Sequence, residues 1–160
     1  MYTGVKQARA TSRILIVRLG AMGDIVHTLP ALASLKHSFP GSHVSWAVEP
    51  QWAPLLEENP FLDRVVLVRR GNPAALLESF RQLRQQSYDI AVDFQGLLKS
   101  ALVASIAWAE RIFGFHQSQV REPLAALFYS NKTRSAAAHV VDMNLDLAAM
   151  HRARRRNTFA

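Results

Sequence analysis

Short apolar runs rich in β-branched residues alternate along the chain with longer segments in which apolar residues recur at helical spacing. The short runs are typical of strands buried on both faces of a parallel sheet, and the longer spacing is typical of helices with one buried face. The apolar runs predict strands at residues 13–18, 43–48, 64–68, 88–92 and 111–114. The longer segments predict helices at residues 24–37, 52–58, 74–86, 97–107 and 139–150.

The alternation of strands and helices predicts the fold class. Short connections between successive elements favour right-handed strand–helix–strand units, which build a sheet with helices on both faces. We therefore expect an α/β protein with a Rossmann-like, doubly wound parallel sheet. One domain is expected over residues 13–150, between a flexible N-terminus at residues 1–12 and a basic, disordered tail at residues 151–160.

The distribution of charge narrows the range of partners. The 160 residues carry a formal net charge of +7. Four of the 19 Lys and Arg residues lie in residues 151–160, so the rest of the chain has 15 basic against 12 acidic residues. Because this body is only mildly basic, we expect no nucleic-acid partner.

Cysteine content and hydropathy bear on location. The chain has no cysteine, and its 6 histidines do not follow the spacing of a zinc site. It therefore offers neither disulfides nor thiolate chemistry, as is usual in a reducing cytoplasm. No apolar run approaches the roughly 20 residues that span a bilayer, and residues 1–12 lack the apolar stretch of a signal peptide. We expect a cytoplasmic protein without a bound metal.

The turn after the first strand is the first candidate site, because ligands of open parallel sheets bind beyond the carboxyl ends of the strands. Gly20 and Gly23 let the backbone turn tightly there, and the next helix directs its unpaired N–H groups at the cleft. Asp24 lies in the first turn of that helix. It fits either an N-terminal helix cap or a general base whose ionised form the helix terminus favours.

The same turn must be compared with the dinucleotide-binding fingerprint G-x-G-x-x-G. Only the final G-x-x-G is present, because residue 18 is Arg18. Glu49, at the end of the second strand, lies about where a ribose-binding acid would be expected. A nucleotide-binding α/β protein of another class therefore stays open as an alternative.

Other strand ends add polar groups to the same edge of the sheet. Arg69 and Arg70 follow the third strand and fit either an anion clamp or ordinary surface charge. After the fourth strand, Asp93 could cap the next helix, while Gly96 and Lys99 face the cleft. A lysine at this edge is a plausible contact for a carboxylate or phosphate.

Two further features have structural interpretations. Arg121 and Glu122 lie in a long connection and could form a fixed ion pair. His27, one turn beyond Asp24, fits packing or hydrogen bonding better than catalysis.

Four ordered segments together resemble the lipopolysaccharide heptosyltransferases of glycosyltransferase family 9, and among these the type I enzymes. They are R-L-G-A-M-G-D-I-V-H-T-L-P-A-L (residues 18–32), N-P-F-L-D-R-V (59–65), D-F-Q-G-L-L-K-S (93–100) and R-E-P-L-A-A-L-F-Y (121–129). The resemblance extends over residues 13–150. It implies the N-terminal, acceptor-binding half of a two-domain GT-B glycosyltransferase, with the C-terminal donor domain absent from this sequence.

The resemblance also implies an activity. It would be an inverting transfer of heptose from ADP-heptose to the Kdo sugar of Kdo2-lipid A, with no metal or cofactor, at the cytoplasmic face of the inner membrane. Asp24 matches the catalytic base of the family. The positions implied to bind the acceptor are Gly23, Arg69, Arg70, Gln95, Gly96, Lys99 and Arg121.

Length separates this chain from the family, whose members are about twice as long and bind the nucleotide sugar mainly through the second domain. We therefore expect the chain alone to have little or no transferase activity. A non-catalytic module that binds anionic glycans is the other alternative.

Overall fold

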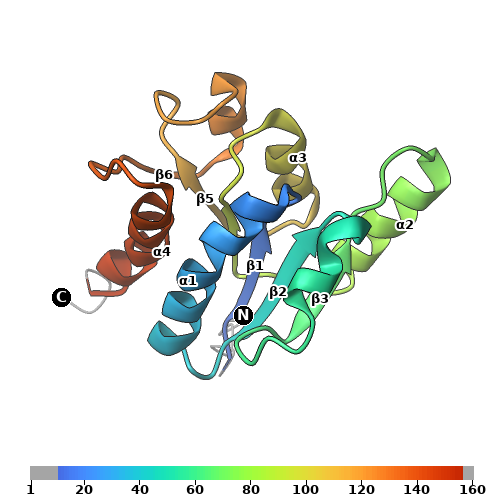
Figure 1. Cartoon of the computed structure of the whole chain (residues 1–160), viewed down its shortest axis with the longest axis horizontal. Coiled ribbons are helices and arrows are strands. Elements are labelled where there is room, and N and C mark those ends of the chain that lie inside the picture. Colours follow the sequence, from blue (N-terminus) through green and yellow to red (C-terminus); the bar gives the residue numbers. More distant parts are fainter. Residues whose placement is uncertain (1–10, 157–160) are drawn as a thin grey trace, which may run out of the picture.

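A computed structural model describes residues 11–156, and the side chains of residues 11–149. Its centre is a parallel sheet of 6 strands in the order β3-β2-β1-β4-β5-β6 (Figure 1). The strands are β1 (Arg13–Val17), β2 (His43–Val48), β3 (Arg64–Leu67), β4 (Ile90–Asp93), β5 (Arg111–Phe115) and β6 (Asn131–Thr133). This confirms the predicted α/β, doubly wound class.

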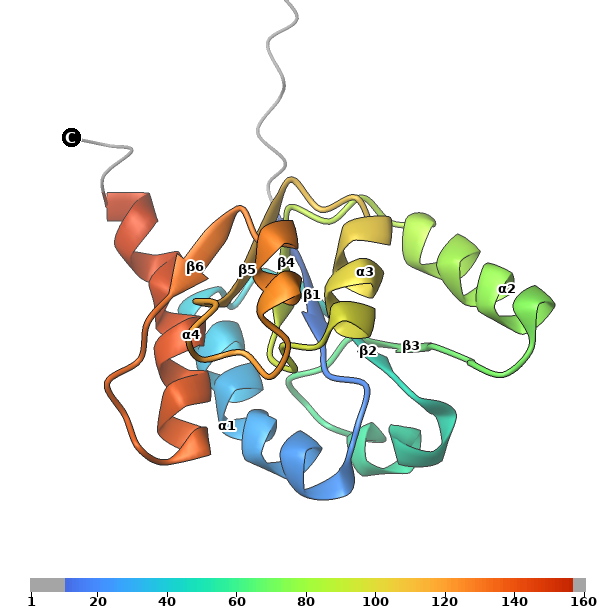
Figure 2. The ribbon, with the colours of Figure 1, turned by 90° about the horizontal axis from the view of Figure 1, so that it is seen from above.

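Helices cover both faces of the sheet (Figures 1 and 2). The α-helices are α1 (Met22–Ser38), α2 (Pro73–Arg84), α3 (Leu98–Ile106) and α4 (Val140–Arg156), and the 3₁₀ helices are η1 (Pro50–Leu56) and η2 (Pro123–Phe128). The core on one face joins the strands to α1, α4 and η1, and the core on the other face joins them to α2 and α3. Within residues 11–156, no helix is long and apolar enough to cross a membrane.

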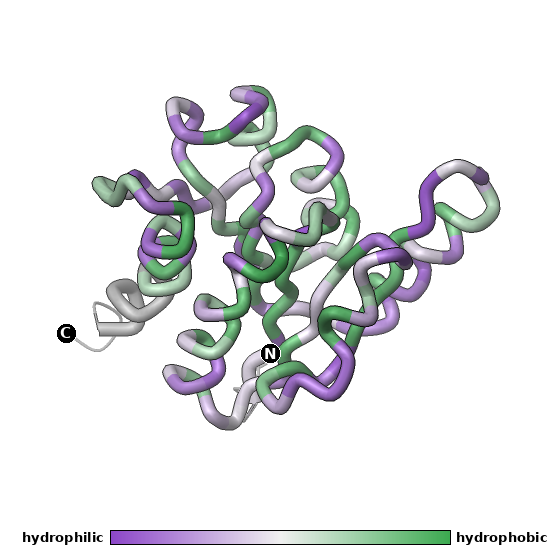
Figure 3. Tube along the Cα trace, viewed as in Figure 1, coloured by the Kyte–Doolittle hydropathy of each residue, from purple (hydrophilic) through white to green (hydrophobic). Residues whose placement is uncertain are grey.

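The first strand shows why the apolar runs are continuous. Ile14 and Ile16 belong to the core under α1, whereas Leu15 and Val17 belong to the core under α2 and α3. Successive side chains of a strand point to opposite faces, so a strand covered on both sides needs apolar residues at every position. Figure 3 shows these hydrophobic positions concentrated along the central strands.

Two features differ from the sequence prediction. Strand β6 and helix η2 were not expected, because the three residues Asn131–Thr133 form a polar edge strand without an apolar run. The helix predicted to end at residue 150 continues to Arg156, so residues 151–156 do not form the disordered tail that we predicted. Arginine favours helices even where no apolar face is available. Residues 1–10 and 157–160, where we predicted flexible ends, lie outside the described residues.

Candidate active site

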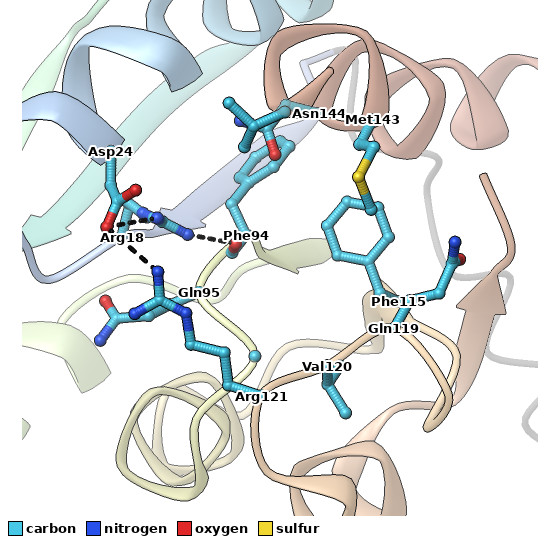
Figure 4. A pocket seen from close by; sticks show the side chains of 12 residues that line it. Arg18, Asp24, Phe94, Gln95, Phe115, Gln119, Val120, Arg121, Met143 and Asn144 are labelled. Atoms are coloured by element: carbon cyan, nitrogen blue, oxygen red, sulfur yellow. Dashed lines mark hydrogen bonds and ion pairs between the residues drawn. The ribbon is translucent and has the colours of Figure 1, made fainter. Parts of the chain in front are cut away.

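The candidate site lies where the strand order reverses, because β1 has β2 on one side and β4 on the other. This is the switch point at which open α/β sheets bind ligands. A pocket of about 120 Å³ opens there, between the start of α1, the β4–α3 loop, the segment before η2 and the start of α4 (Figure 4). Asp24, Gln95, Gly96 and Arg121 line it, so the structure brings four of the predicted site residues together.

Asp24 is held between two arginines. Its Oδ2 lies 2.9 Å from Nη2 of Arg18 and 3.7 Å from Nη2 of Arg121, and its side chain is 26% exposed. Figure 4 shows both guanidinium groups turned toward this carboxylate. The helix-cap interpretation is wrong, because α1 begins at Met22 and its N-cap is Ala21, which has no side-chain cap bond.

Arg18 is a charged site residue that the sequence motifs did not indicate. It is 4% exposed, and Nη1 donates a hydrogen bond to the backbone oxygen of Phe94. Burial lowers the pKa of Arg18, while the neighbouring Asp24 carboxylate opposes that shift. In the sequence, Arg18 stands out only as a departure from the dinucleotide fingerprint. A charged residue at the end of a buried strand, six positions before an aspartate, is the signal that could have identified it.

Asp93 organises the loop that forms one wall of the pocket. Its buried carboxylate accepts hydrogen bonds from the backbone N–H groups of Gln95 and Gly96 and from the hydroxyls of Ser100 and Tyr129. Burial raises the pKa of Asp93 although these bonds oppose the shift, and burial beside this carboxylate raises the pKa of Tyr129.

The predicted cap role of Asp93 is also wrong, because the N-cap of α3 is Leu97. The backbone N–H of Leu98 donates to Oε2 of Glu122 at 2.6 Å. Glu122 therefore supports the start of α3, while Arg121 turns to Asp24. The predicted ion pair between Arg121 and Glu122 is not formed.

Gln95 and Gly96 are constrained by close packing at the pocket wall. Oε1 of Gln95 accepts a hydrogen bond from the backbone N–H of Leu19 at 2.7 Å, which ties the loop after β4 to the loop after β1. Gly96 has φ of +68°, and a Cβ there would lie 3.1 Å from Val120. Gly23 lies exposed next to Asp24 on the first turn of α1.

A second charged cluster lies beside the pocket, around Glu49. Arg70 forms an ion pair with Oε1 of Glu49, and Nζ of Lys99 lies 3.9 Å from the same oxygen. The backbone N–H of Glu49 donates to Leu19, next to the pocket. The acid suggested for a ribose is therefore a counter-ion for two predicted acceptor-binding cations. Arg69 is apart from them and lines a separate cavity with Ser79.

His27 packs at the contact between α1 and α4. Its ring lies edge-on to that of His139, with 6.0 Å between ring centres, and its backbone oxygen accepts from Nδ2 of Asn144. This agrees with a packing role. In the part of the chain with described side chains, no group of three or more His, Asp and Glu residues could hold a metal ion.

Comparisons with known proteins bear on the family of this chain. A model of glycosyltransferase family 9 (heptosyltransferase) matches residues 76–153. Lipopolysaccharide heptosyltransferase 1 of Escherichia coli K12 is 38% identical over 149 residues, covering 86% of this chain and 46% of the relative. Its counterpart in Pseudomonas aeruginosa is 35% identical, covering 73% of this chain and 36% of the relative. The chain thus spans about half the length, or less, of these curated relatives.

Solved structures are similar over the same extent. The structure of E. coli heptosyltransferase WaaC with ADP-2-deoxy-2-fluoro heptose matches with a TM-score of 0.79 at 33% identity, covering 86% of this chain and 47% of that chain. E. coli ADP-heptose LPS heptosyltransferase II matches with a TM-score of 0.69 at 20% identity, which shows the fold alone.

The fold and the site at its switch point define one Rossmann-like half of a GT-B glycosyltransferase. The chain belongs to glycosyltransferase family 9, the heptosyltransferases, and its curated relatives include the type 1 enzymes that the sequence motifs had indicated.

Proposed function

We propose that this chain is the N-terminal, acceptor-binding half of an inverting heptosyltransferase, with Asp24 as its catalytic base. The reaction would move heptose from ADP-heptose to the Kdo of Kdo2-lipid A during synthesis of the lipopolysaccharide core. One observation carries the proposal: the Asp24 carboxylate lines a pocket at the switch point and is held there by a buried arginine. The similar E. coli structure, which was solved with a fluorinated ADP-heptose, supports the donor class.

The geometry suits a single base. Both arginines approach Oδ2 of Asp24, so Oδ1 is the oxygen that would take the proton of the acceptor hydroxyl. The oxygen of that hydroxyl attacks the anomeric carbon as the bond from this carbon to the ADP phosphate oxygen breaks. In-line displacement inverts the anomeric centre, and ADP leaves with the bonding electron pair.

Arg18 fixes the orientation of the base. Its guanidinium lies 2.9 Å from Oδ2 of Asp24 and donates a second hydrogen bond to the backbone oxygen of Phe94. A buried cation without its counter-ion is costly, so the Asp24 carboxylate is kept at Arg18 in one position.

Exposed cations around the pocket suit an acceptor with carboxylates and phosphates. The side chains of Arg121, Arg70 and Lys99 are 65%, 46% and 40% exposed. Guanidinium and ammonium groups form strong charge-assisted hydrogen bonds with such anions. We include Gly23, Gln95 and Gly96 as walls of the acceptor site, and Arg69 from the family resemblance alone.

The rest of the proposal concerns the whole enzyme. The chain spans 46% of the length of the E. coli relative, so we propose that a second, donor-binding half completes the site and that the chain alone has little or no transferase activity. We further propose that catalysis needs no metal or cofactor. The complete protein would act in the cytoplasm, peripheral to the inner membrane, without a nucleic-acid partner.

Calorimetry on the 160-residue chain tests the acceptor assignment. We expect binding of deacylated Kdo2-lipid A and weak or no binding of ADP. The Asp24→Asn variant should bind the same acceptor, because it keeps the shape of the side chain. Tight ADP binding without acceptor binding would instead support the nucleotide-binding alternative.

A further inference from the structure

Large apolar side chains are exposed on two elements next to the pocket. Leu124 and Leu127 of η2 are 61% and 75% exposed, and Leu98 and Leu102 of α3 are 36% and 41% exposed. Residues three apart in a 3₁₀ helix, or four apart in an α-helix, lie on the same side. Because η2 packs on α3 through Ala101 and its neighbours, we name these four residues the leucine surface.

The leucine surface is continuous with the rim of the pocket. Leu98 follows Gly96 by two positions and Leu124 follows Arg121 by three, and both Gly96 and Arg121 line the pocket. Glu122 joins the two segments, since its carboxylate accepts from Leu98 and its backbone N–H donates to Gly96. Whatever covers the leucine surface therefore lies against the entrance to the site.

The charges of the same region indicate an anionic partner. The cations nearest the leucine surface in the chain are Lys99 on α3 and Arg121 just before η2, and the acid is Glu122. Lys132 and Arg134 are exposed on the edge strand β6 and the segment after it, and the Glu122 carboxylate is already bonded to Leu98. Exposed leucines combined with an excess of basic side chains match the surface of an anionic bilayer, which offers acyl chains below negative headgroups.

We propose that the leucine surface docks on an anionic lipid bilayer, with Leu124 and Leu127 at the boundary between headgroups and acyl chains. This inference rests on the proposed function in one respect: a lipid acceptor must keep its acyl chains in the bilayer while its sugar reaches Asp24. Docking through η2 and α3 brings the pocket entrance close to the membrane surface, because the pocket-lining Gly96 and Arg121 lie two and three positions before Leu98 and Leu124. An acceptor headgroup then reaches the base without leaving the membrane.

A fluorescent probe tests where the membrane lies. The chain has no cysteine, so Leu127→Cys creates a single site for a polarity-sensitive dye. Vesicles of phosphatidylcholine and phosphatidylglycerol in equal parts should raise the fluorescence several-fold. Leu77→Cys on α2 is the matched control, because Leu77 is also an exposed leucine, at 50%, and its dye should stay in water.

The control also separates the leucine surface from other modes of binding. Equal responses at both positions, or no response at residue 127, would overturn the proposal. Vesicle binding carried only by the arginines of residues 151–160 would leave the Leu127 probe in water and count against it. A probe that is already in an apolar environment before vesicles are added would show that protein covers the leucine surface, which would also overturn the proposal.

Sedimentation with the same vesicles measures affinity. Leu124→Asp combined with Leu127→Asp should lower vesicle partitioning about tenfold or more, because two apolar anchors are lost and two negative charges are added. Leu77→Asp should leave it unchanged. Both sites are exposed, so circular dichroism should show the same folded spectrum for all three proteins.

Binding of the water-soluble acceptor distinguishes failure of the inference from failure of the proposed function. The double aspartate variant should bind deacylated Kdo2-lipid A as the parent chain does, since neither leucine lines the pocket. Vesicle docking without acceptor binding would refute the proposed acceptor and leave the docking surface standing. Acceptor binding with no docking, or with docking unchanged in the double variant, would refute the docking surface alone.

Discussion

Two clusters at the same edge of the sheet each combine one carboxylate with two cations, but only the first contains a deeply buried cation. In the first, the side chains of Asp24, Arg18 and Arg121 are 26%, 5% and 65% exposed. In the second, Glu49 is 13% exposed, whereas Arg70 and Lys99 are 46% and 40% exposed. The first cluster therefore fixes its acid on a buried arginine, and in the second a partly buried acid holds two exposed cations together.

This difference assigns separate tasks to similar residues. A base must reach a hydroxyl and keep one orientation, which a buried arginine provides for Asp24. An anion-binding site must present hydrogen-bond donors. The partly buried carboxylate of Glu49 keeps two cations close together and leaves some of their N–H groups free to bind a ligand. The backbone contact between Glu49 and Leu19 connects the two clusters.

The largest expected effect comes from removing the base. In a complete enzyme that contains this half, Asp24→Asn should lower kcat about 100-fold to 10,000-fold, the range typical of general-base catalysis. Steady-state transfer of heptose to the acceptor measures it, and calorimetry should show acceptor affinity within about twofold of the parent. Turnover near the parental rate would mean that the Asp24 cluster is not catalytic.

The second-largest expected effect is on the free energy of unfolding, which should respond differently to changes in the two clusters. Asp24→Ala should lower the free energy of unfolding by about 3 kcal/mol, because it strands the buried Arg18 charge. Glu49→Ala should cost less than about 1 kcal/mol, because its cations can turn to water. Urea unfolding of the two variants measures both values, and similar losses would contradict the contrast in burial.

Binding by the second cluster is expected to change moderately. Arg70→Ala and Lys99→Ala should each weaken binding of deacylated Kdo2-lipid A about tenfold, the loss of one charge-assisted hydrogen bond. Arg69→Ala is the neighbouring control and should have a smaller effect, because Arg69 lines a different cavity. An Arg69→Ala effect as large as that of Arg70→Ala would mean that Arg69 binds the acceptor as directly as Arg70 does.

The smallest expected effect is on the buried network around Asp93, which supports both clusters. The loop after Asp93 carries the Phe94 oxygen that accepts from Arg18, and it leads into α3, which bears Lys99. The pKa of Tyr129 is raised by burial from its ordinary value of 10.0. A raised pKa contributes stability that is complete below pH 10 and is lost as the pH rises, since only the unfolded chain then releases its proton.

The stability advantage of the parent over Tyr129→Phe should therefore be constant below about pH 10 and shrink above it by about 1.4 kcal/mol per pH unit. Urea midpoints across that range provide the measurement. An advantage that does not change with pH would mean that Tyr129 ionises as readily in the folded protein as in the unfolded chain.

Much of the fold could be predicted because the pattern of burial is local. Every strand covered on both faces appeared as an apolar run, and the turn before α1 was recognised from its glycines and Asp24. The edge strand β6 was missed because its alternate exposure leaves Lys132 in water and its buried positions are polar Asn131 and Thr133. The end of α4 was misplaced because arginines can extend a helix without an apolar face.

The sequence predicted which residues belong to the candidate site better than it predicted the contacts between them. Sequence motifs gathered Asp24, Lys99 and Arg121 at one edge of the sheet, but local position left open that Arg121 pairs with Glu122 and that Asp24 caps a helix. The structure gives Asp24 two arginine partners and gives Glu122 to the start of α3 instead. Sequence neighbours are close in space, yet which of them share a bond depends on how each backbone turn directs its side chains.

The sequence by itself determined the succession of strands and helices, the family and the identity of the candidate base, because each of these follows from short stretches of chain. Only the tertiary structure decided the partners of that base and the wall opposite it. Asn144 of α4 lines the pocket and donates to His27, 117 positions away, although no local pattern distinguishes Asn144 from any other polar residue on a helix. Such a contact exists because the sheet order brings α4 against α1, and the energy of one long-range hydrogen bond leaves no periodic trace in a sequence.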